Sequence, residues 1–262
     1  MTSSDGEPIA MKSQIDEYTN LCVALPVINE VGNLEYLLPS LLTNYPGVTV
    51  LVIDDSSTDG TKGFILQLKA GGSKIQYIRN ESRFGIGYAH KLALEYAITN
   101  GFSYLCTMDA DLTHSPKYIR DLLVAAQDNS VVIASRFANG GEMVNWKFSR
   151  RLLAHMGHKV TKLLFELNLD MSSSYRIYRL PNERLQKVFR SVPDNYDFFF
   201  SSTILLNSNE VSLSEQGVRM FQRLDGSSKM TFKYVASGIF RILSWRIFLK
   251  QKRQNSSALL ED

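Results

Sequence analysis

The feature that most constrains the fold is an alternation of short apolar runs with helix-like segments from Leu21 to about Ser135. The apolar runs are rich in β-branched residues and bounded by polar turns, which is typical of buried strands. The segments between them carry apolar residues at helical spacing. Strands that alternate with helices predict an α/β fold, with a mostly parallel sheet flanked by helices on both faces. The expected strands are residues 21–26, 48–54, 75–79, 104–109 and 131–136, and the expected helices are residues 33–42, 60–69, 85–101 and 115–127.

Composition narrows the class of protein. With 262 residues, 44% of them hydrophobic, the chain can bury a full core. A net charge of +3 with interspersed Lys and Arg predicts no nucleic-acid partner. No run reaches the ~18 apolar residues expected of a transmembrane helix. Cys22 and Cys106 lie in apolar runs, so we expect buried thiols without a disulfide, which suits a cytoplasmic protein.

Polar residues follow four of the expected strands. Ligands of open α/β sheets bind in the crevice beyond the carboxyl ends of the strands, so these residues are expected to share one site. They are Pro26, Asn29 and Glu30 after the first strand, Asp54, Asp55 and Asp59 after the second, Asp109 and Asp111 after the fourth, and Arg136 after the fifth.

Asp109 and Asp111 are two carboxylates held one residue apart. Like charges this close repel unless something neutralises them. A hard divalent cation, Mg²⁺ or Mn²⁺, is held by one or two carboxylates, with water and substrate phosphates in the remaining positions. Such a pair can also occur in a solvated turn, but its place among four polar strand ends favours a metal and phosphate site.

Four segments, in order, resemble a known family: "ALPVINE", "VIDDSSTDGT", "GIGYAHKLALEYA" and "MDADLTHSP". They are similar to the inverting nucleotide-sugar glycosyltransferases of the GT-A fold, and most closely to dolichol-phosphate mannose synthases and bacterial polyprenyl-phosphate sugar transferases. Further along, "NWKFSRRLLAHMGHKVTKLL", "DMSSSYRIYR" and "FQRLDGSSKM" resemble that subfamily, so the likeness covers roughly residues 21–234.

The resemblance implies roles for individual residues. It places Asp109, Ala110 and Asp111 on the metal and diphosphate motif, with Thr113 where some relatives supply a further metal ligand. It implies that Asp109, Asp111, Arg150 and Arg223 are the catalytic group. The nucleotide pocket would be lined by Pro26, Ile28, Glu30, Ile53 and Asp55, and the cations around the donor diphosphate and acceptor phosphate would be Arg136, Arg150, Arg223 and Lys229.

The chain also departs from the family pattern. Ile28 stands where many relatives have Tyr, Ser174 where the motif has Gly, and Ser201 where relatives often carry Glu. Because only glycine tolerates positive φ freely, the change at Ser174 predicts a loop of different shape.

Apolar residues from Leu152 to Leu164 recur at helical spacing and predict an amphipathic helix. On it Arg150 and Arg151 could simply face water, and His155 and His158 are expected on the helix surface rather than as metal ligands. The aromatic run 196–200 is typical of core rather than of a sugar platform.

Three regions are expected: a polar flexible tail (1–20), a GT-A glycosyltransferase domain (21–230), and an amphipathic basic and aromatic helix with a polar tail (231–262). The last segment suits a helix lying among lipid headgroups or one packed on the domain. We therefore expect a cytoplasmic protein, peripheral on the cytoplasmic face of a membrane.

The resemblance implies a metal-dependent transfer of mannose or glucose, with inversion, from a nucleoside diphosphate sugar to a polyprenyl phosphate such as dolichyl or undecaprenyl phosphate. A lipid phosphate with a second pKa near ~6 arrives ionised and needs no strong base. Two alternatives stay open. A glycan hydroxyl acceptor would need a base such as Asp194 or Asp197, and a non-catalytic module would only bind the nucleotide sugar.

Overall fold

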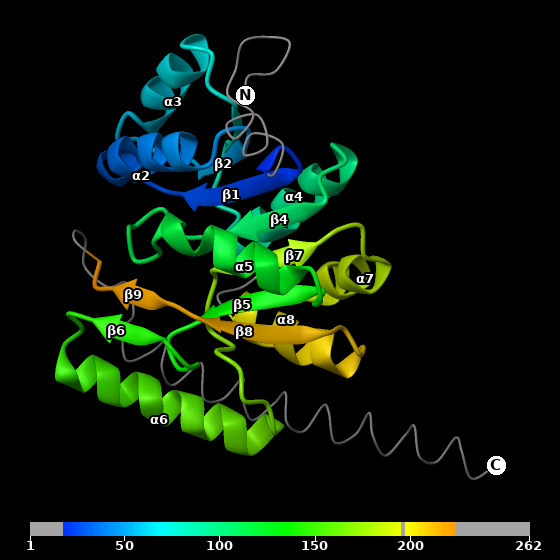
Figure 1. Cartoon of the computed structure of the whole chain (residues 1–262). Helices are drawn as coiled ribbons and strands as arrows, with labels where there is room; N and C mark the ends of the chain where they lie inside the picture. The colour runs from blue at the N-terminus through cyan, green and yellow to red at the C-terminus, as the bar shows by residue number, and fades with distance from the viewer. Residues whose placement is uncertain (1–17, 195–196, 224–262) are drawn as a thin grey trace, which may run out of the picture.

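A computed structural model describes residues 18–194 and 197–223 (Figure 1). Its centre is a seven-stranded sheet in the order β3-β2-β1-β4-β7-β5-β8. All neighbouring strands pair in parallel except at β7, which is antiparallel to both β4 and β5. The strands are β1 (Leu21–Val27), β2 (Thr49–Asp55), β3 (Ile75–Asn80), β4 (Tyr104–Thr107), β5 (Val131–Ser135), β7 (Arg176–Arg179) and β8 (Leu213–Gly217).

Helices cover both faces of this sheet. Alternate strand residues point to opposite faces, so Val23 and Leu25 of β1 enter one core while Cys22 and Ala24 enter the other. The first core is closed by α2 (Val31–Asn44), α3 (Thr61–Ala70), the short 3₁₀ helix η1 (Pro116–Tyr118) and α5 (Ile119–Ala126). The second is closed by α4 (Ile86–Thr99), α7 (Glu183–Ser191) and α8 (Phe198–Ser208).

A second, two-stranded parallel sheet lies beside the main one and pairs β6 (Glu142–Val144) with β9 (Arg219–Phe221). The chain leaves β6 into α6 (Phe148–Phe165), which runs along the edge of the molecule in Figure 1. Phe137, after β5, stacks on His158 of α6 with ring centroids 4.1 Å apart. At the far end of the helix, Phe165 contacts Phe200 of α8.

The predicted α/β fold is confirmed, and the expected strands and helices up to Ser135 lie within a few residues of the observed ones. One boundary matters: the fourth strand ends at Thr107, so Asp109 and Asp111 lie in the loop that follows it. Strand β7 was not predicted, because a four-residue segment that begins and ends with arginine lacks the apolar pattern of a buried strand.

Arg176 of β7 is fully buried, and its hydrogen bonds within the described residues reach backbone carbonyls and the Ser202 hydroxyl rather than a carboxylate. Its Nε donates to the carbonyl of Ser173, and its Nη2 donates to the carbonyls of Met171 and Phe199. Burial lowers the pKa of this guanidinium. The carbonyls satisfy the donors that desolvation would otherwise leave unpaired.

Both cysteines are buried free thiols, as predicted. Cys22 pairs with Leu105 in the β1–β4 register, and Cys106 pairs with Val23, so the two side chains lie on opposite faces of the sheet. Burial raises the pKa of Cys22 to about 12. The aromatic run is also core where it is described, since Phe198 and Phe199 are buried.

None of the helices within residues 18–194 and 197–223 is long and apolar enough to cross a membrane. The predicted tail helix (231–262), Lys229 and most of the N-terminal tail lie outside the described residues. The domain boundaries stay predictions.

Gly217 offers a test of this packing. A Cβ there would lie 2.0 Å from the carbonyl oxygen of Asn139 and 2.8 Å from the nitrogen of Gly141. We expect Gly217→Ala to lower the free energy of unfolding by ~1–3 kcal/mol, because the loop after β5 must move. Gly157→Ala, in the open interior of α6, is the control and should raise stability by roughly 0.5–1 kcal/mol. Urea unfolding followed by circular dichroism measures both, and equal stabilities would contradict the packing.

Candidate active site

The loops after β1 and β2 are tied together at one edge of the sheet. The Asn29 backbone N–H donates to Ser57 Oγ, and the Thr58 N–H donates back to Asn29 Oδ1, at 2.9 and 2.7 Å. Asn29 and Ser56 both have positive φ, a conformation that costs energy in a non-glycine residue and is held by its surroundings. These loops therefore form a fixed rim rather than a free surface.

The two acidic residues at the end of β2 have different partners. Asp54 is buried and accepts hydrogen bonds from Tyr77 Oη at 2.5 Å and from Arg79 Nη1 at 2.8 Å. Asp55, the predicted nucleotide residue, accepts from the backbone N–H groups of Phe84 and Gly85. Its carboxylate therefore holds the loop that leads into α4.

Asp109 sits in the loop after β4, and two neighbours fix it. Its backbone N–H donates to Nδ1 of His114 at 3.1 Å, and its Oδ1 accepts from Ser174 Oγ at 2.8 Å. The side chain is 37% exposed, so its carboxylate can still reach a ligand. Ser174, where relatives have glycine, does not adopt positive φ in this chain and instead supplies a hydroxyl to the first aspartate.

Asp111 is almost buried and already faces a cation. Arg223, two residues after β9, places Nε and Nη2 each 2.6 Å from Asp111 Oδ2. Burial acts to raise the pKa of Asp111, but the Thr113 hydrogen bonds and the Arg223 charge outweigh it and leave that pKa lowered. Burial likewise acts against the charged form of Arg223, while Asp111, Glu30 and Asp109 raise its pKa. Glu30, Asp109, Asp111 and Arg223, which come from the loops after β1, β4 and β9, thus interact through their charges.

Arg136, the predicted cation that follows the fifth strand, also has an acidic partner. Its Nε and Nη2 donate to the two carboxylate oxygens of Asp170 at 2.7 and 3.0 Å. Asp170 is 1% exposed. Burial acts to raise its pKa, but the charge and hydrogen bonds of Arg136 overcome this and lower it. This bidentate pair fixes the guanidinium in one orientation.

Arg136 and Arg150 both contact the indole ring of Trp146. The guanidinium carbon of Arg136 lies 5.5 Å from the ring centroid, and that of Arg150 lies 4.2 Å from it. Such cation–π contacts orient a cation without neutralising it. Arg150, in the first turn of α6, is thereby brought to the side of the molecule that carries Arg136.

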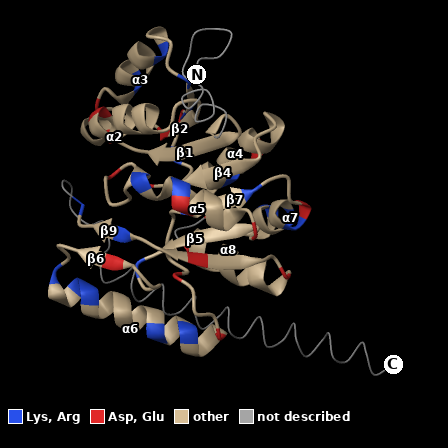
Figure 2. Ribbon diagram, viewed as in Figure 1, with Lys and Arg blue, Asp and Glu red and all other residues tan. Residues whose placement is uncertain are grey.

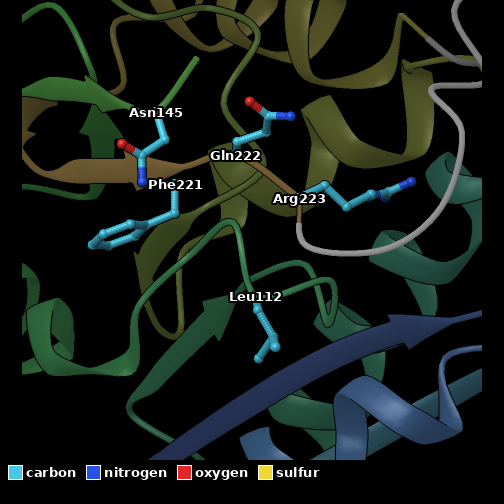
Figure 3. A pocket seen from close by; sticks show the side chains of 5 residues that line it. All are labelled: Leu112, Asn145, Phe221, Gln222 and Arg223. Atoms are coloured by element: carbon cyan, nitrogen blue, oxygen red, sulfur yellow. The ribbon is translucent and has the colours of Figure 1, made fainter. Parts of the chain in front are cut away.

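A pocket opens between the aspartate loop and the small sheet. Figure 3 shows Leu112 on one side and the β9 end on the other, with Asn145 after β6. Leu112 and Asn145 both have positive φ. For a side chain as bulky as leucine this is uncommon, and such strain clusters at functional sites. The pocket is lined by Leu112, Asn145, Phe221, Gln222 and Arg223.

The residues that could hold a metal ion here are Asp109 and Asp111, whose oxygens are the hard ligands that Mg²⁺ and Mn²⁺ prefer. Within the part of the chain that the structure describes, no group of three or more His, Cys, Asp or Glu could hold a metal. Thr113, the suggested further ligand, donates its backbone N–H to Asp111 Oδ1 at 3.0 Å. His155 is exposed, as expected of a helix-surface residue, whereas His158 is half-buried against Phe137.

The sequence was compared with family models. Residues 22–187 match the model described as glycosyl transferase family 2, a span that includes the aspartate loop, Arg136 and Arg150. The chain belongs to glycosyl transferase family 2. The predicted family is thereby confirmed, and the protein is a glycosyltransferase.

Similar proteins agree with this assignment. The transferase is 29% identical over 222 residues to an undecaprenyl-phosphate mannosyltransferase of Micrococcus luteus, covering 84% of this chain and 91% of the relative. It is 30% identical over 230 residues to a polyprenol monophosphomannose synthase of Mycolicibacterium smegmatis, covering 86% of each. Among solved structures, a mannosyltransferase of Pyrobaculum calidifontis in complex with GDP-Man and Mn²⁺ has a TM-score of 0.56 at 16% identity, over 80% of this chain and 58% of that one. The last likeness concerns the fold alone.

The structure places the remaining predicted residues of the transferase as follows. Pro26 and Ile53 are partners in the β1–β2 register. Ile28 and Glu30 are half-exposed in the loop after β1, and Ala110 is buried between the two aspartates. Their roles in nucleotide binding stay predictions.

Sequence reasoning missed His114 and Asp170. His114 stood in the quoted aspartate motif, and Asp170 opened the "DMSSSYRIYR" segment. An acidic residue in a segment that resembles the family was the signal for a partner to one of the predicted arginines. Which arginine it meets depends on a contact across 34 residues of chain.

The Arg136–Asp170 pair can be tested by stability. Because the folded-state pKa of Asp170 is depressed, its contribution is present above the unfolded pKa near ~3.9 and is lost as pH falls through the folded pKa. We expect Asp170→Asn to cost ~3–5 kcal/mol at neutral pH, because Arg136 loses a buried counter-charge. Urea unfolding at several pH values should show this cost shrinking in acid.

Glu142→Gln is the matched control. Glu142 pairs with Arg219 at 2.8 Å, close to the 2.7 Å between Asp170 and Arg136, but both side chains of this pair are about half exposed. An exposed pair of this kind contributes at most ~1 kcal/mol. Equal losses of unfolding free energy for the two variants would contradict the conclusion that burial makes the Asp170 contribution large.

Proposed function

We propose that this glycosyltransferase moves a hexosyl group from a nucleoside diphosphate sugar to a polyprenyl phosphate. Mannose is the first choice for the transferred sugar, and glucose is the second. The observation that carries the proposal is the cluster of Asp109, Asp111 and Arg223 at the strand-end rim, in a family 2 chain. The choice of acceptor and of mannose rests on the names of the two relatives described above, which match 84% and 86% of the chain.

A divalent cation, Mn²⁺ or Mg²⁺, is part of the proposal. Asp109 and Asp111 fit it, because one carboxylate is partly exposed and the other already holds a positive group. The fold neighbour from P. calidifontis was solved with Mn²⁺ and a nucleotide sugar, which supports this choice. When bound, such an ion withdraws charge from the leaving nucleoside diphosphate.

The chain's own cations would orient the two phosphorylated substrates. Arg223 lies where it can contact both the aspartate pair and an anion in the adjoining pocket. Arg136 is fixed by Asp170, and Arg150 by Trp146, so each presents its guanidinium in a defined direction. Lys229, outside the described residues, is the fourth cation of the proposal. Orientation and charge neutralisation would then account for most of the rate.

A lipid phosphate acceptor places little demand on a general base. The two carboxylates suggested as bases for a glycan hydroxyl have neighbours of their own. Lys91 Nζ lies 2.7 Å from Asp194 Oδ1, and Ser201 Oγ donates to Asp197 Oδ2 at 3.0 Å. Both carboxylates are thus already engaged by neighbouring side chains, whereas an ionised phosphate acceptor requires neither of them as a base. This observation favours the phosphate acceptor over the hydroxyl.

The proposed acceptor is a membrane lipid, so we also propose that the protein works at a membrane surface, on the cytoplasmic face where nucleotide sugars are expected.

The reaction is tested by incubating the purified protein with a panel of nucleotide sugars and a short polyprenyl phosphate, with and without Mn²⁺. Asp111→Asn should abolish both metal-dependent transfer and Mn²⁺ binding measured by isothermal titration calorimetry, because half of the hard donor set is lost. Asp128→Asn, in an exposed turn, is the control and should behave like the wild type. Unchanged wild-type activity in excess EDTA, or full activity of folded Asp111→Asn, would refute the metal site.

Asp197→Asn separates the two acceptor classes. With a lipid phosphate the nucleophile is already charged, so the rate at saturating donor should stay within a modest factor of the wild type. With a sugar hydroxyl, loss of the base should cost roughly 10²–10⁴-fold. Transfer rates are compared after circular dichroism has shown that both proteins are folded. A hundredfold loss would shift the proposal to a glycan acceptor, and Asp194→Asn is tested in the same way.

A further inference from the structure

Helix α6 carries an apolar surface that the described part of the chain leaves uncovered. Six of the ten large hydrophobic side chains that are exposed among the described residues lie on this one helix. Leu163 and Phe148 at its ends are each 79% exposed. Apolar side chains are normally scattered singly on a protein surface, and a contiguous set marks an interaction site. The six residues, called here the α6 face, are Phe148, Leu152, Leu153, Met156, Val160 and Leu163.

The α6 face points away from the domain. At about 100° per residue, its six members fall within an arc of roughly 140°. His158, which packs on Phe137, and Phe165, which packs on Phe200, fall on the opposite side of the helix, while His155, which also meets Phe137, falls beside the Phe148 edge of the arc. The helix is therefore attached by one side and presents its apolar side outward.

Cations accompany this apolar arc. Between Lys147 and Phe165 the sequence contains no Asp or Glu, and α6 carries Arg150, Arg151, Lys159 and Lys162. Figure 2 shows these basic residues along the helix. By the same helical spacing, Lys162 and Arg151 fall just outside the Phe148 edge of the apolar arc, and Lys159 falls just inside it, between Phe148 and Leu152. An apolar stripe bordered by Lys and Arg is the pattern of a helix that lies in the headgroup region of an anionic bilayer.

The helix is also connected to the candidate active site. Arg150, in its first turn, contacts Trp146, and Asn145 just before it lines the pocket beside Arg223. β6, which leads into α6, pairs with β9, which leads to Arg223. The helix that would meet a bilayer is therefore joined directly to the strand and the loop that line this pocket.

We propose that α6 docks the transferase on an anionic membrane surface, with the α6 face in the apolar boundary and its lysines and arginines at the lipid phosphates. The docking deepens the proposed function, since it would bring a lipid-borne acceptor phosphate to the pocket beside Arg223. The residues that carry this proposal all lie on helix α6.

The test uses the full chain and flotation with vesicles of phosphatidylcholine containing about one third phosphatidylglycerol. The double variant Met156→Gln and Leu163→Gln removes two members of the α6 face, and we expect about tenfold weaker partitioning than for the wild type. Its matched control is Leu66→Gln with Val124→Gln, which removes two exposed apolar side chains from α3 and α5 and should leave partitioning unchanged.

A charge variant tests the second half of the proposal. Lys159→Gln with Lys162→Gln should lose roughly tenfold or more on the anionic vesicles, at about 1 kcal/mol for each charge near the surface. On vesicles of phosphatidylcholine alone it should bind like the wild type.

Other occupants of the α6 face give different results. A change of oligomeric state in the Met156 and Leu163 variant, seen by light scattering, would assign the face to a second copy of the chain. A large loss of thermal stability in that variant would assign it to another segment of the same chain. Either result with unchanged vesicle partitioning, or no vesicle binding by the wild type, would overturn the docking.

Failure of the docking can be told apart from failure of the proposed function. Transfer to a short, water-soluble polyprenyl phosphate without vesicles should be the same for the Met156 and Leu163 variant and the wild type. If neither protein catalyses that transfer, the proposed acceptor is wrong while the vesicle result still decides the docking.

Discussion

Charge compensation at one edge of a parallel sheet is the constraint on which the rest of this structure depends. Parallel strands end at the same edge, so the residues that follow them converge whether or not their charges agree. Three of the acidic side chains near this edge are nearly buried, and each is met by an arginine from elsewhere in the chain. Asp54 meets Arg79, Asp111 meets Arg223, and Asp170 meets Arg136. Without these partners the desolvated carboxylates would be unstable as anions.

The three pairs differ in how far the arginine can still bind another anion. Arg79 is held by Asp54 beneath the rim and also donates to the carbonyl of Ser57, so it stabilises a loop. Arg223 uses two nitrogens on a single oxygen of Asp111, and a third of its side chain is exposed. It is therefore the cation best placed to exchange one anion for another. That property suits a site where a metal ion and a diphosphate are proposed to meet.

Helix α6 shows the opposite arrangement, with cations that are not paired with acids of the same helix. There the cations have no acidic residue within the helix, and the apolar side chains between them meet solvent instead of the core. The cores of the sheet are buried so fully that even both cysteines have no exposure. The α6 face, which stays exposed, contributes no comparable hydrophobic free energy to folding. The membrane docking proposed above would give the uncovered face a physical reason, because the proposed acceptor is carried by a lipid.

The sequence by itself determined the fold class, the order of elements up to β5 and the rim residues after β1, β2 and β4, because strand and helix periods are local properties of the chain. It also placed both aspartates of the candidate site. It could not determine which arginine meets which acid, because Asp111 and Arg223 are 112 residues apart and Arg136 and Asp170 are 34 apart. The period of α6 likewise predicted an apolar face without saying what covers it. Only the tertiary structure decided these points, since pairing and exposure depend on where distant segments pack.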